Sequence, residues 1–274
     1  MHLIDVNQFK KVMFRAGELA RTLRQEGFSI DRSNKSNIST SADKALSEYL
    51  DEELPRILNV PIINEETYFE STAPTDSQFW LVDPIDGTLS FINGFDGYVT
   101  QAALMINGVP TIAIVYAPES NELFFAESEL GAFKNEIPIR VSPNLFPQSI
   151  IDNYSHPDPV ITKIITELGI SHYQESGSLG LKICRVAEGT ADLFIKHTRV
   201  YDWDIAPGAL ILKEAGGHSS MLDGEEFNFK IGMKKENFLA SNRLQDLAKL
   251  NSILTEERST RKPLSPGATI EKVE

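Results

Sequence analysis

Residues 98 to 135 limit the possible folds of this chain more than any other stretch. Four short runs rich in β-branched and aromatic residues follow one another there, separated by turn signals that include Asn107-Gly108. The runs YVTQAALMI, VPTIAIVYAP, ELFFAES and GAFKN predict an antiparallel meander. Helical patterns flank this region without strict alternation of strand and helix. The sequence therefore favours an α/β (α+β) protein with layered, mixed and largely antiparallel sheets.

Helical spacing of apolar residues is clear on both sides of the meander. It predicts an amphipathic first helix over about residues 7 to 25, and a second helix over 42 to 54 that begins after STSAD. Ser39, Thr40 or Ser41 would cap the second helix, and Pro55 would interfere with its end. Later patterns predict helices at 158–169 and 180–189, a strand at 191–196, a helix over 203–217 and a closing strand at 218–222.

Composition excludes several classes of protein. A formal charge of -13 argues against binding a nucleic-acid polymer, although it leaves small phosphorylated ligands open. No segment approaches about 18 uninterrupted apolar residues, and the first residues lack a signal-peptide pattern, so we expect a cytoplasmic protein without membrane contact. Cys184 is the single cysteine, which rules out an intramolecular disulfide or a thiolate metal cluster.

Acidic residues gather where three apolar or aromatic segments end or begin. The pairs are Glu65 and Glu66 after VPIIN, Asp83 and Asp86 after FWLV, and Asp202 and Asp204 around Trp203. Any one pair is equally typical of a solvated turn. Hard cations such as Mg²⁺, however, prefer carboxylate oxygens together with water and phosphate oxygens. Convergence of the three pairs would create a site for two such ions.

The Gly87-Thr88 pair that follows Asp86 adds a possible phosphate contact. A helix beginning there would direct free backbone N–H groups and a hydroxyl toward an anion held beside the metals. The spacing of Asp83 and Asp86 also differs from that of haloacid-dehalogenase phosphatases, whose nucleophilic aspartate is followed two residues later by its acid partner. A covalent aspartyl-phosphate is therefore not expected.

Three segments together resemble the inositol monophosphatase superfamily of Mg²⁺-dependent, lithium-sensitive phosphatases. They are NEET at 64–67, DPIDGT at 83–88 and WDIAPGALILKEAGG at 203–217, and the similarity runs in order over about residues 7 to 245. The resemblance implies an αβαβα layered sandwich. We expect an N-terminal half at 1–140, a C-terminal half at 141–254 that carries Asp204 and the substrate-side loop, and a disordered tail at 255–274.

The resemblance also implies a ligand set for the metals. Glu65, Asp83 and the carbonyl of Ile85 would hold a first Mg²⁺ ion. Asp83, Asp86 and Asp204 would hold a second, and a third, weaker ion would lie near Glu65. These ions are the only cofactors that the resemblance implies.

Catalytic roles follow from the same resemblance. Thr88, hydrogen-bonded to Asp43, would orient and deprotonate the attacking water, while Glu65 anchors the metal that lowers the pKa of that water. Gly87 and Thr88 would contact the phosphate. Water would attack phosphorus directly, without a phosphoenzyme.

The substrate is expected to be a small phosphorylated metabolite, and several segments resemble the 3'(2'),5'-bisphosphate nucleotidase branch. They are FWLVDPIDGT, VYAPESNELFFAE, GAFKN and GSLGLKICRVAEGTADLF. Lys182 and Lys196 fall where that branch carries basic residues near a second phosphate, although both also suit an ordinary helix and strand end. His197, beside the substrate loop, is a further candidate contact. Adenosine 3',5'-bisphosphate is therefore the first candidate substrate.

Two departures weaken the nucleotidase assignment. Leu89-Ser90 replaces the Lys-Glu pair that nucleotidases show after Gly-Thr, and Lys35 and Asn37 stand where they carry an acidic residue. Inositol 1-phosphate, fructose bisphosphate and histidinol phosphate stay open as substrates. A catalytically silent regulator that binds a phosphorylated metabolite is the alternative of another class, although no metal ligand is missing. The sequence leaves the choice between monomer and homodimer open.

Overall fold

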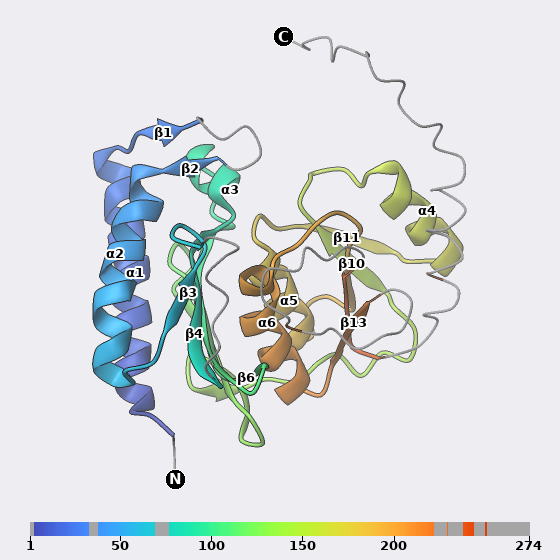
Figure 1. Cartoon of the computed structure of the whole chain (residues 1–274). Coiled ribbons are helices and arrows are strands. Elements are labelled where there is room, and N and C mark those ends of the chain that lie inside the picture. The colour runs from blue at the N-terminus through green and yellow to red at the C-terminus, as the bar shows by residue number, and fades with distance from the viewer. Residues whose placement is uncertain are drawn as a thin grey trace, which may run out of the picture.

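The structure, a computed structural model, describes residues 3–32, 38–68, 77–221, 229, 238–243 and 250. These residues form five layers in the order αβαβα, which run from left to right in Figure 1. The outer helices are α1 (Val6–Glu26) and α2 (Ser41–Ile57) on one side and α4 (Pro159–Leu168) on the other. Between the two sheets lie α5 (Leu179–Ala187) and α6 (Asp202–Glu214). This confirms the predicted layered α/β fold.

The first sheet has seven strands in the order of the chain. They are β3 (Ile62–Asn64), β4 (Gln78–Asp86), β5 (Val99–Ile106), β6 (Val109–Ala117), β7 (Glu122–Glu127), β8 (Gly131–Lys134) and β9 (Ile137–Pro138). Only β3 and β4 pair in parallel, so the predicted meander is confirmed. Its first turn places Asn107 and Gly108 at φ of 52° and 76°, the left-handed geometry that Asn-Gly adopts readily in hairpins.

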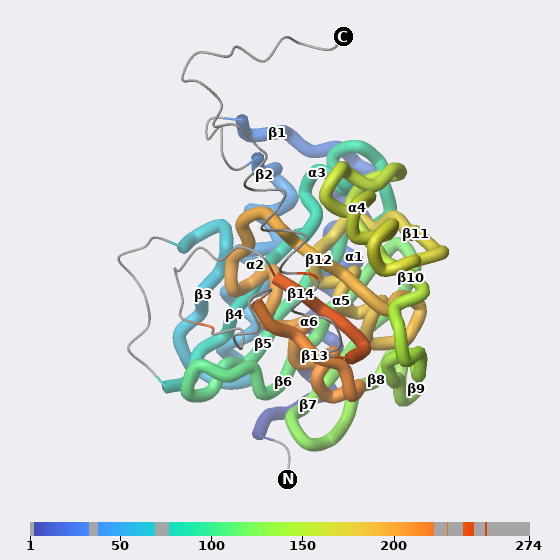
Figure 2. Tube along the Cα trace, turned by 90° about the vertical axis from the view of Figure 1, so that its right-hand side faces the viewer, coloured from blue at the N-terminus to red at the C-terminus, as the bar shows by residue number. Residues whose placement is uncertain are grey.

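The second sheet has five strands in the order β11-β10-β12-β14-β13, and Figure 2 turns it toward the viewer. They are β10 (Ser149–Asp152), β11 (His172–Glu175), β12 (Leu193–Lys196), β13 (His218–Met221) and β14 (Phe238–Ser241). β10 is parallel to both of its neighbours, and β14 is antiparallel to both of its own. The sheets are thus mixed and largely antiparallel, as predicted. The remaining elements are β1 (Ile30–Asp31), β2 (Ser39–Thr40) and α3 (Thr88–Ile92).

The start of α2 is fixed by a capping box. The Thr40 hydroxyl accepts from the backbone N–H of Asp43, whose carboxylate accepts in turn from the Thr40 N–H. The end differs from the prediction, because the helix passes through Pro55 and ends at Ile57. Proline removes one helical hydrogen bond. The buried Leu54 nevertheless keeps the last turn against the sheet, and its carbonyl accepts from Leu58 N at 3.1 Å.

The largest hydrophobic core lies between the two sheets, around α5 and α6. Leu81 and Val115 of the first sheet, Leu210 of α6 and Phe194 of the second sheet all belong to it. α6 is buried on nearly every side, as expected for a helix between two sheets. The division into halves at 1–140 and 141–254 stays a prediction, since both contribute to this core. The tail at 255–274 lies outside the described residues.

None of the helices in the described ranges combines the length and the apolar character of a membrane span.

Candidate active site

Three acidic residues from distant parts of the chain meet at one edge of the first sheet. Glu65 follows β3, Asp83 lies near the end of β4, and Asp204 lies in the first turn of α6. One carboxylate oxygen from each can be chosen so that all lie within 4.8 Å of one another. Because β3 and β4 are parallel, with Asn64 opposite Val82, Glu65 reaches the level of Asp83. The convergence predicted for the three acidic segments is therefore present for these residues.

A β-bulge brings Asp86 to the same group. Residues three apart on a regular strand point to opposite faces of the sheet. Here the register shifts, because Asp83 pairs with Gln101 and Asp86 with Val99. The extra residue turns Asp86 back toward the other acids. The bulge itself is supported by Thr100, whose hydroxyl donates to the Pro84 carbonyl at 2.9 Å. This bulge explains why two aspartates three apart can serve one site.

Aromatic packing and a backbone bond hold Asp204 in place. Its Oδ2 accepts from the backbone N–H of Tyr201 at 2.8 Å. The ring of Trp203 stacks on that of Tyr201 at 4.8 Å with an interplanar angle of 6°, and Tyr68 contacts Trp203 edge-on. Trp203 is thus a packing residue beside the site.

The electrostatics of the carboxylate group favour a bound cation. Burial, and then the charge of Asp204, raise the pKa of Glu65, while burial and then Glu65 raise that of Asp83. Burial and then Asp86 raise the pKa of Asp204 to about 8. Neither oxygen of the buried Asp83 side chain accepts a hydrogen bond from a backbone or amide donor among the described residues. Carboxyls in such surroundings either keep protons or bind positive charge.

The donor set therefore fits Mg²⁺, which takes oxygen ligands and is bound in proteins through a few carboxylates. Asp83 is the most suitable ligand, because it is buried and aimed at the other acids. Glu65 and Asp204 are each partly exposed. The carbonyl of Ile85, the predicted backbone ligand, accepts from the Thr88 hydroxyl at 3.2 Å.

Thr88 and Asp43 lie together as predicted. The Thr88 hydroxyl donates to Asp43 Oδ1 at 3.5 Å, a long hydrogen bond that spans 45 residues of sequence. Burial raises the pKa of Asp43, against the opposing bonds from Thr40. Thr88 begins the short helix α3, and the preceding Gly87 has a φ of 91°, a conformation that favours glycine. The expected helix start at Gly87-Thr88 is confirmed, although the helix is only five residues long.

The N-terminus of α5 holds Asp86 from the other side. Gly180 N donates to Asp86 Oδ2 at 2.7 Å, and Gln101 Nε2 donates to the same oxygen at 3.3 Å. Gln101 also donates to the carbonyls of Trp203 and Asp204, at 3.1 and 3.3 Å, so one amide joins β4, β5 and α6. A Cβ on Gly180 would lie 2.1 Å from Gln101 Oε1, so a side chain at this position would displace the Gln101 amide.

Gln101 and Gly180 were not predicted from the sequence. The sequence signal for Gln101 is weak: it is the one amide side chain in the mainly apolar run YVTQAALMI. Gly180 offered no comparable signal, since its contact depends on a helix packing against a strand far away in the sequence.

A cleft of about 620 Å³ opens beside Asp86. One wall carries Gly87 and Thr88, next to the first sheet. The other wall carries Asn153, after β10 of the second sheet, and Gly177, before α5. The cleft is large enough for a small phosphorylated molecule.

The three basic residues predicted to contact substrate have different surroundings. Lys182 is fully buried, and burial lowers its pKa to about 7 against the opposing effect of Asp86. Lys196 ends β12, close enough to Asp204 to lower the pKa of that carboxyl. His197 pairs with Asp158 at 2.7 Å between Nε2 and Oδ2. Their roles in substrate binding stay predictions.

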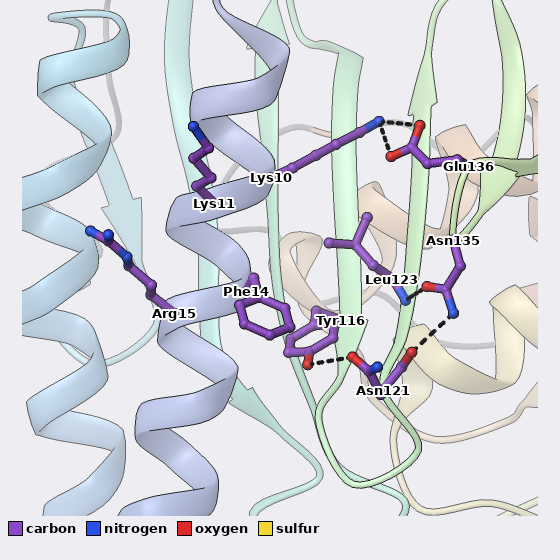
Figure 3. Close-up of a pocket in the computed structure, with 9 residues that line it drawn as sticks. All are labelled: Lys10, Lys11, Phe14, Arg15, Tyr116, Asn121, Leu123, Asn135 and Glu136. Carbon is purple, nitrogen blue, oxygen red and sulfur yellow. Dashed lines mark hydrogen bonds and ion pairs between the residues drawn. The ribbon is translucent and has the colours of Figure 1, made fainter.

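A second concavity, of about 340 Å³, lies between α1 and the first sheet (Figure 3). Its carboxylate, Glu136, is paired with Lys10 at 2.8 Å, and the Tyr116 hydroxyl donates to Asn121 Oδ1 at 3.1 Å. Among the described residues that line it, Glu136 is the single acid. This concavity therefore lacks the oxygen ligands of a Mg²⁺ site.

The profile of the inositol monophosphatase family matches residues 5–259. An inositol monophosphatase from Mesembryanthemum crystallinum is 30% identical over 244 residues, which cover 79% of this chain and 85% of that protein. A Thermotoga maritima protein named fructose-1,6-bisphosphatase/inositol-1-monophosphatase is 32% identical over 211 residues, or 76% of this chain and 79% of the relative. The structure of a T. maritima IMPase superposes with a TM-score of 0.80 at 28% identity and covers 92% of this chain and 99% of that one.

These relatives are named for inositol monophosphatase, not for the nucleotidase branch that the sequence segments suggested. The resemblance to the wider family is confirmed, and the finer assignment is not supported. With the family profile matched across nearly the whole described fold, this chain belongs to the inositol monophosphatase family of metal-dependent phosphatases, and it is a phosphoric monoester hydrolase.

Proposed function

We propose that the protein is a Mg²⁺-dependent phosphatase that hydrolyses an inositol phosphate or a closely similar polyol phosphate. The observation that carries this proposal is the convergence of Glu65, Asp83 and Asp204 within 4.8 Å. The neighbouring Asp86 lines a cleft. Relatives named inositol monophosphatase that are 30% identical or more support the substrate class.

In the proposed site, two Mg²⁺ ions would be held by Glu65, Asp83, Asp86, Asp204 and the Ile85 carbonyl, with a third, weaker ion near Glu65. When bound, such ions lower the pKa of water and offset charge on a phosphate. The protein supplies the positions: the β-bulge directs Asp86, and Gln101 with Gly180 N holds its Oδ2.

Thr88 and Asp43 would direct the attacking water. The Thr88 hydroxyl lies between two acceptors, Asp43 Oδ1 at 3.5 Å and the Ile85 carbonyl at 3.2 Å. When its proton points to Asp43, the lone pairs of the Thr88 oxygen are free to accept from a water at the edge of the cleft. The raised pKa of Asp43 suits a group that receives a proton during the reaction. Gly87 and Thr88 would contact the phosphate.

Adenosine 3',5'-bisphosphate is the second candidate, on the strength of the nucleotidase-like segments around Lys182 and Lys196. The surroundings of Lys182 weigh against it, because a fully buried ammonium bonded to protein oxygens is poorly placed to bind a second phosphate. Lys35 and Asn37, where the sequence departs from nucleotidases, lie outside the described residues.

A panel of phosphate esters tests the proposal. Phosphate release would be measured with millimolar Mg²⁺ on inositol 1-phosphate, fructose 1,6-bisphosphate, histidinol phosphate and adenosine 3',5'-bisphosphate, with Asp83→Asn as the inactive control. We expect the highest kcat/KM on inositol 1-phosphate. A clear preference for the bisphosphate nucleotide would overturn the substrate and leave the phosphatase standing. Binding without any turnover would instead favour the silent regulator.

A further inference from the structure

Lys182 lies in the wall behind the cleft, where its ammonium is surrounded by three oxygens. It donates to Asn153 Oδ1, to the Ser176 carbonyl at 3.3 Å and to the Gly177 carbonyl at 3.4 Å. The same nitrogen lies 5.2 Å from the centre of the Phe194 ring. A lysine ammonium has three N–H donors, so these acceptors use all of them. Lys182 therefore has no donor left for a ligand.

This arrangement fixes the orientation of the Asn153 side chain. The atom of Asn153 that faces Lys182 is the carboxamide oxygen, which suits the ammonium form of lysine because that form has donors only. The amide nitrogen then points away from Lys182. Within the described residues no group accepts a hydrogen bond from this nitrogen. Asn153 is half-buried and lines the cleft, so its two N–H donors are available to a ligand there.

The position of Asn153 relative to the carboxylates indicates which part of a substrate it would contact. Asp86 and Thr88 lie on the wall next to the first sheet, where the phosphate is proposed to bind. Asn153 lies on the wall formed by the second sheet, directly after β10. A phosphate ester placed between the two walls would direct its phosphate to Gly87 and Thr88, and its alcohol portion to Asn153.

We propose that Asn153 is a substrate-binding residue that donates a hydrogen bond to an oxygen on the alcohol portion of the substrate, and that Lys182 is the positioning residue that keeps the amide N–H groups facing the cleft. This inference rests on the proposed function and extends it, because it assigns selectivity for a hydroxyl-bearing leaving group to one side chain. The substrate class is a phosphate monoester of a polyol.

The test compares two esters that differ in the alcohol portion. The alcohol portion of inositol 1-phosphate carries free hydroxyl groups, whereas that of phenyl phosphate has no oxygen apart from the ester oxygen bonded to phosphorus. Asn153→Asp keeps an oxygen toward Lys182 and replaces the NH₂ donor with a second oxygen of nearly the same size. We expect kcat/KM on inositol 1-phosphate to fall roughly 10 to 100-fold, mainly through a higher KM. The variant loses the amide donor, and its carboxylate oxygen then faces an acceptor oxygen of the substrate. The kcat/KM for phenyl phosphate should change less than about threefold.

A matched control separates hydrogen bonding from added charge. Asn93→Asp places the same negative charge in the same cleft, on the exposed residue directly after α3. It should affect both esters alike.

The Lys182 variants test the positioning role. Lys182→Met should raise KM on inositol 1-phosphate, because the Asn153 amide is then free to turn. Lys182→Gln keeps one donor toward Asn153 and should raise KM less than Lys182→Met does. Equal losses on both esters in Asn153→Asp would overturn the proposal.

A binding measurement keeps this inference distinct from the proposed function. If the unchanged protein hydrolyses neither ester, the proposed function fails. The role of Asn153 is then measured by the rise in Tm that inositol 1-phosphate causes with Mg²⁺ present. A rise lost in Asn153→Asp but kept in Asn93→Asp would support the assignment. No rise in the unchanged protein, or an equal rise in both variants, would contradict it.

Discussion

Replacing Asp83 with asparagine should stabilise the metal-free protein, because it removes one charge from a buried group of acids. Asp83 is buried, and its pKa is raised by burial and then by Glu65, Asp86 and Asp204. An acid whose pKa is raised on folding binds more protons in the folded state. The stabilising contribution of protonated Asp83 in the metal-free protein is therefore complete below about pH 4, the ordinary pKa of aspartate, and is lost as the pH rises through the raised value.

The size of the effect can be bounded. A carboxyl avoids repulsion by keeping its proton, which costs about 1.4 kcal/mol for each pH unit above its ordinary pKa of about 3.9. This cost sets the upper limit of the destabilisation that the Asp83 carboxyl can cause. The limit is roughly 5 to 6 kcal/mol at pH 8 and about 1.5 kcal/mol at pH 5. The asparagine amide can donate to Glu65 and Asp204, so little of the gain is lost. We expect Asp83→Asn to add about 2 to 4 kcal/mol at pH 8 and less than about 1 kcal/mol at pH 5.

Urea unfolding of chelator-treated protein at pH 5 and pH 8, with and without Mg²⁺, measures this effect. The unchanged protein should gain about 2.7 kcal/mol at pH 8 when Mg²⁺ reaches 100 times its Kd. Asp83→Asn should gain far less, since it lacks a ligand that both ions are proposed to share. The reasoning is refuted if Asp83→Asn is less stable than the unchanged protein at pH 8, or if Mg²⁺ stabilises the two equally.

Three further results are expected. Thr88→Ala should lower kcat by at least tenfold while Mg²⁺ still raises Tm, and an unchanged kcat would remove Thr88 from the mechanism. Gly180→Ala should lower both activity and stability, because its Cβ would lie 2.1 Å from Gln101 Oε1. Gly17→Ala is the control: its Cβ would lie 2.3 Å from Tyr116 Cδ1, so it should lower the free energy of unfolding by about 1 to 3 kcal/mol and spare kcat. Millimolar lithium should inhibit phosphate release, as the family resemblance implies, and its failure to do so would indicate a different metal pocket.

The layers could be predicted because their elements repeat a clear pattern over many residues. α1 shows its apolar stripe over 21 residues, and the strands from β5 to β8 are separated by glycine and asparagine turns. β10, β11 and β14, of four residues each, were missed, whereas β8, β12 and β13 are equally short and were predicted. β11, with the sequence HYQE, is also polar and has no buried residue, so nothing in it indicates a strand until β10 pairs with it.

The acidic residues of the site could be recognised because each follows or precedes a buried segment. Asp83 and Asp86, in particular, follow the buried apolar residues 79–82 of the same strand. The supporting residues could not be recognised in the same way. Gln101 contacts the carbonyl of Trp203 across 102 residues of sequence, and Asn153 depends on Lys182 for its orientation. Such contacts are consequences of the folded layers and leave little trace in the local sequence.

Phosphate release by metal-stripped protein, followed as Mg²⁺ is returned, tests most directly whether Glu65, Asp83 and Asp204 form the metal site of a phosphatase. The account predicts no release after chelation, recovery that saturates with Mg²⁺, and no recovery in Asp83→Asn at the same concentrations. Full activity in the stripped protein, or recovery in Asp83→Asn equal to that of the unchanged chain, would contradict it.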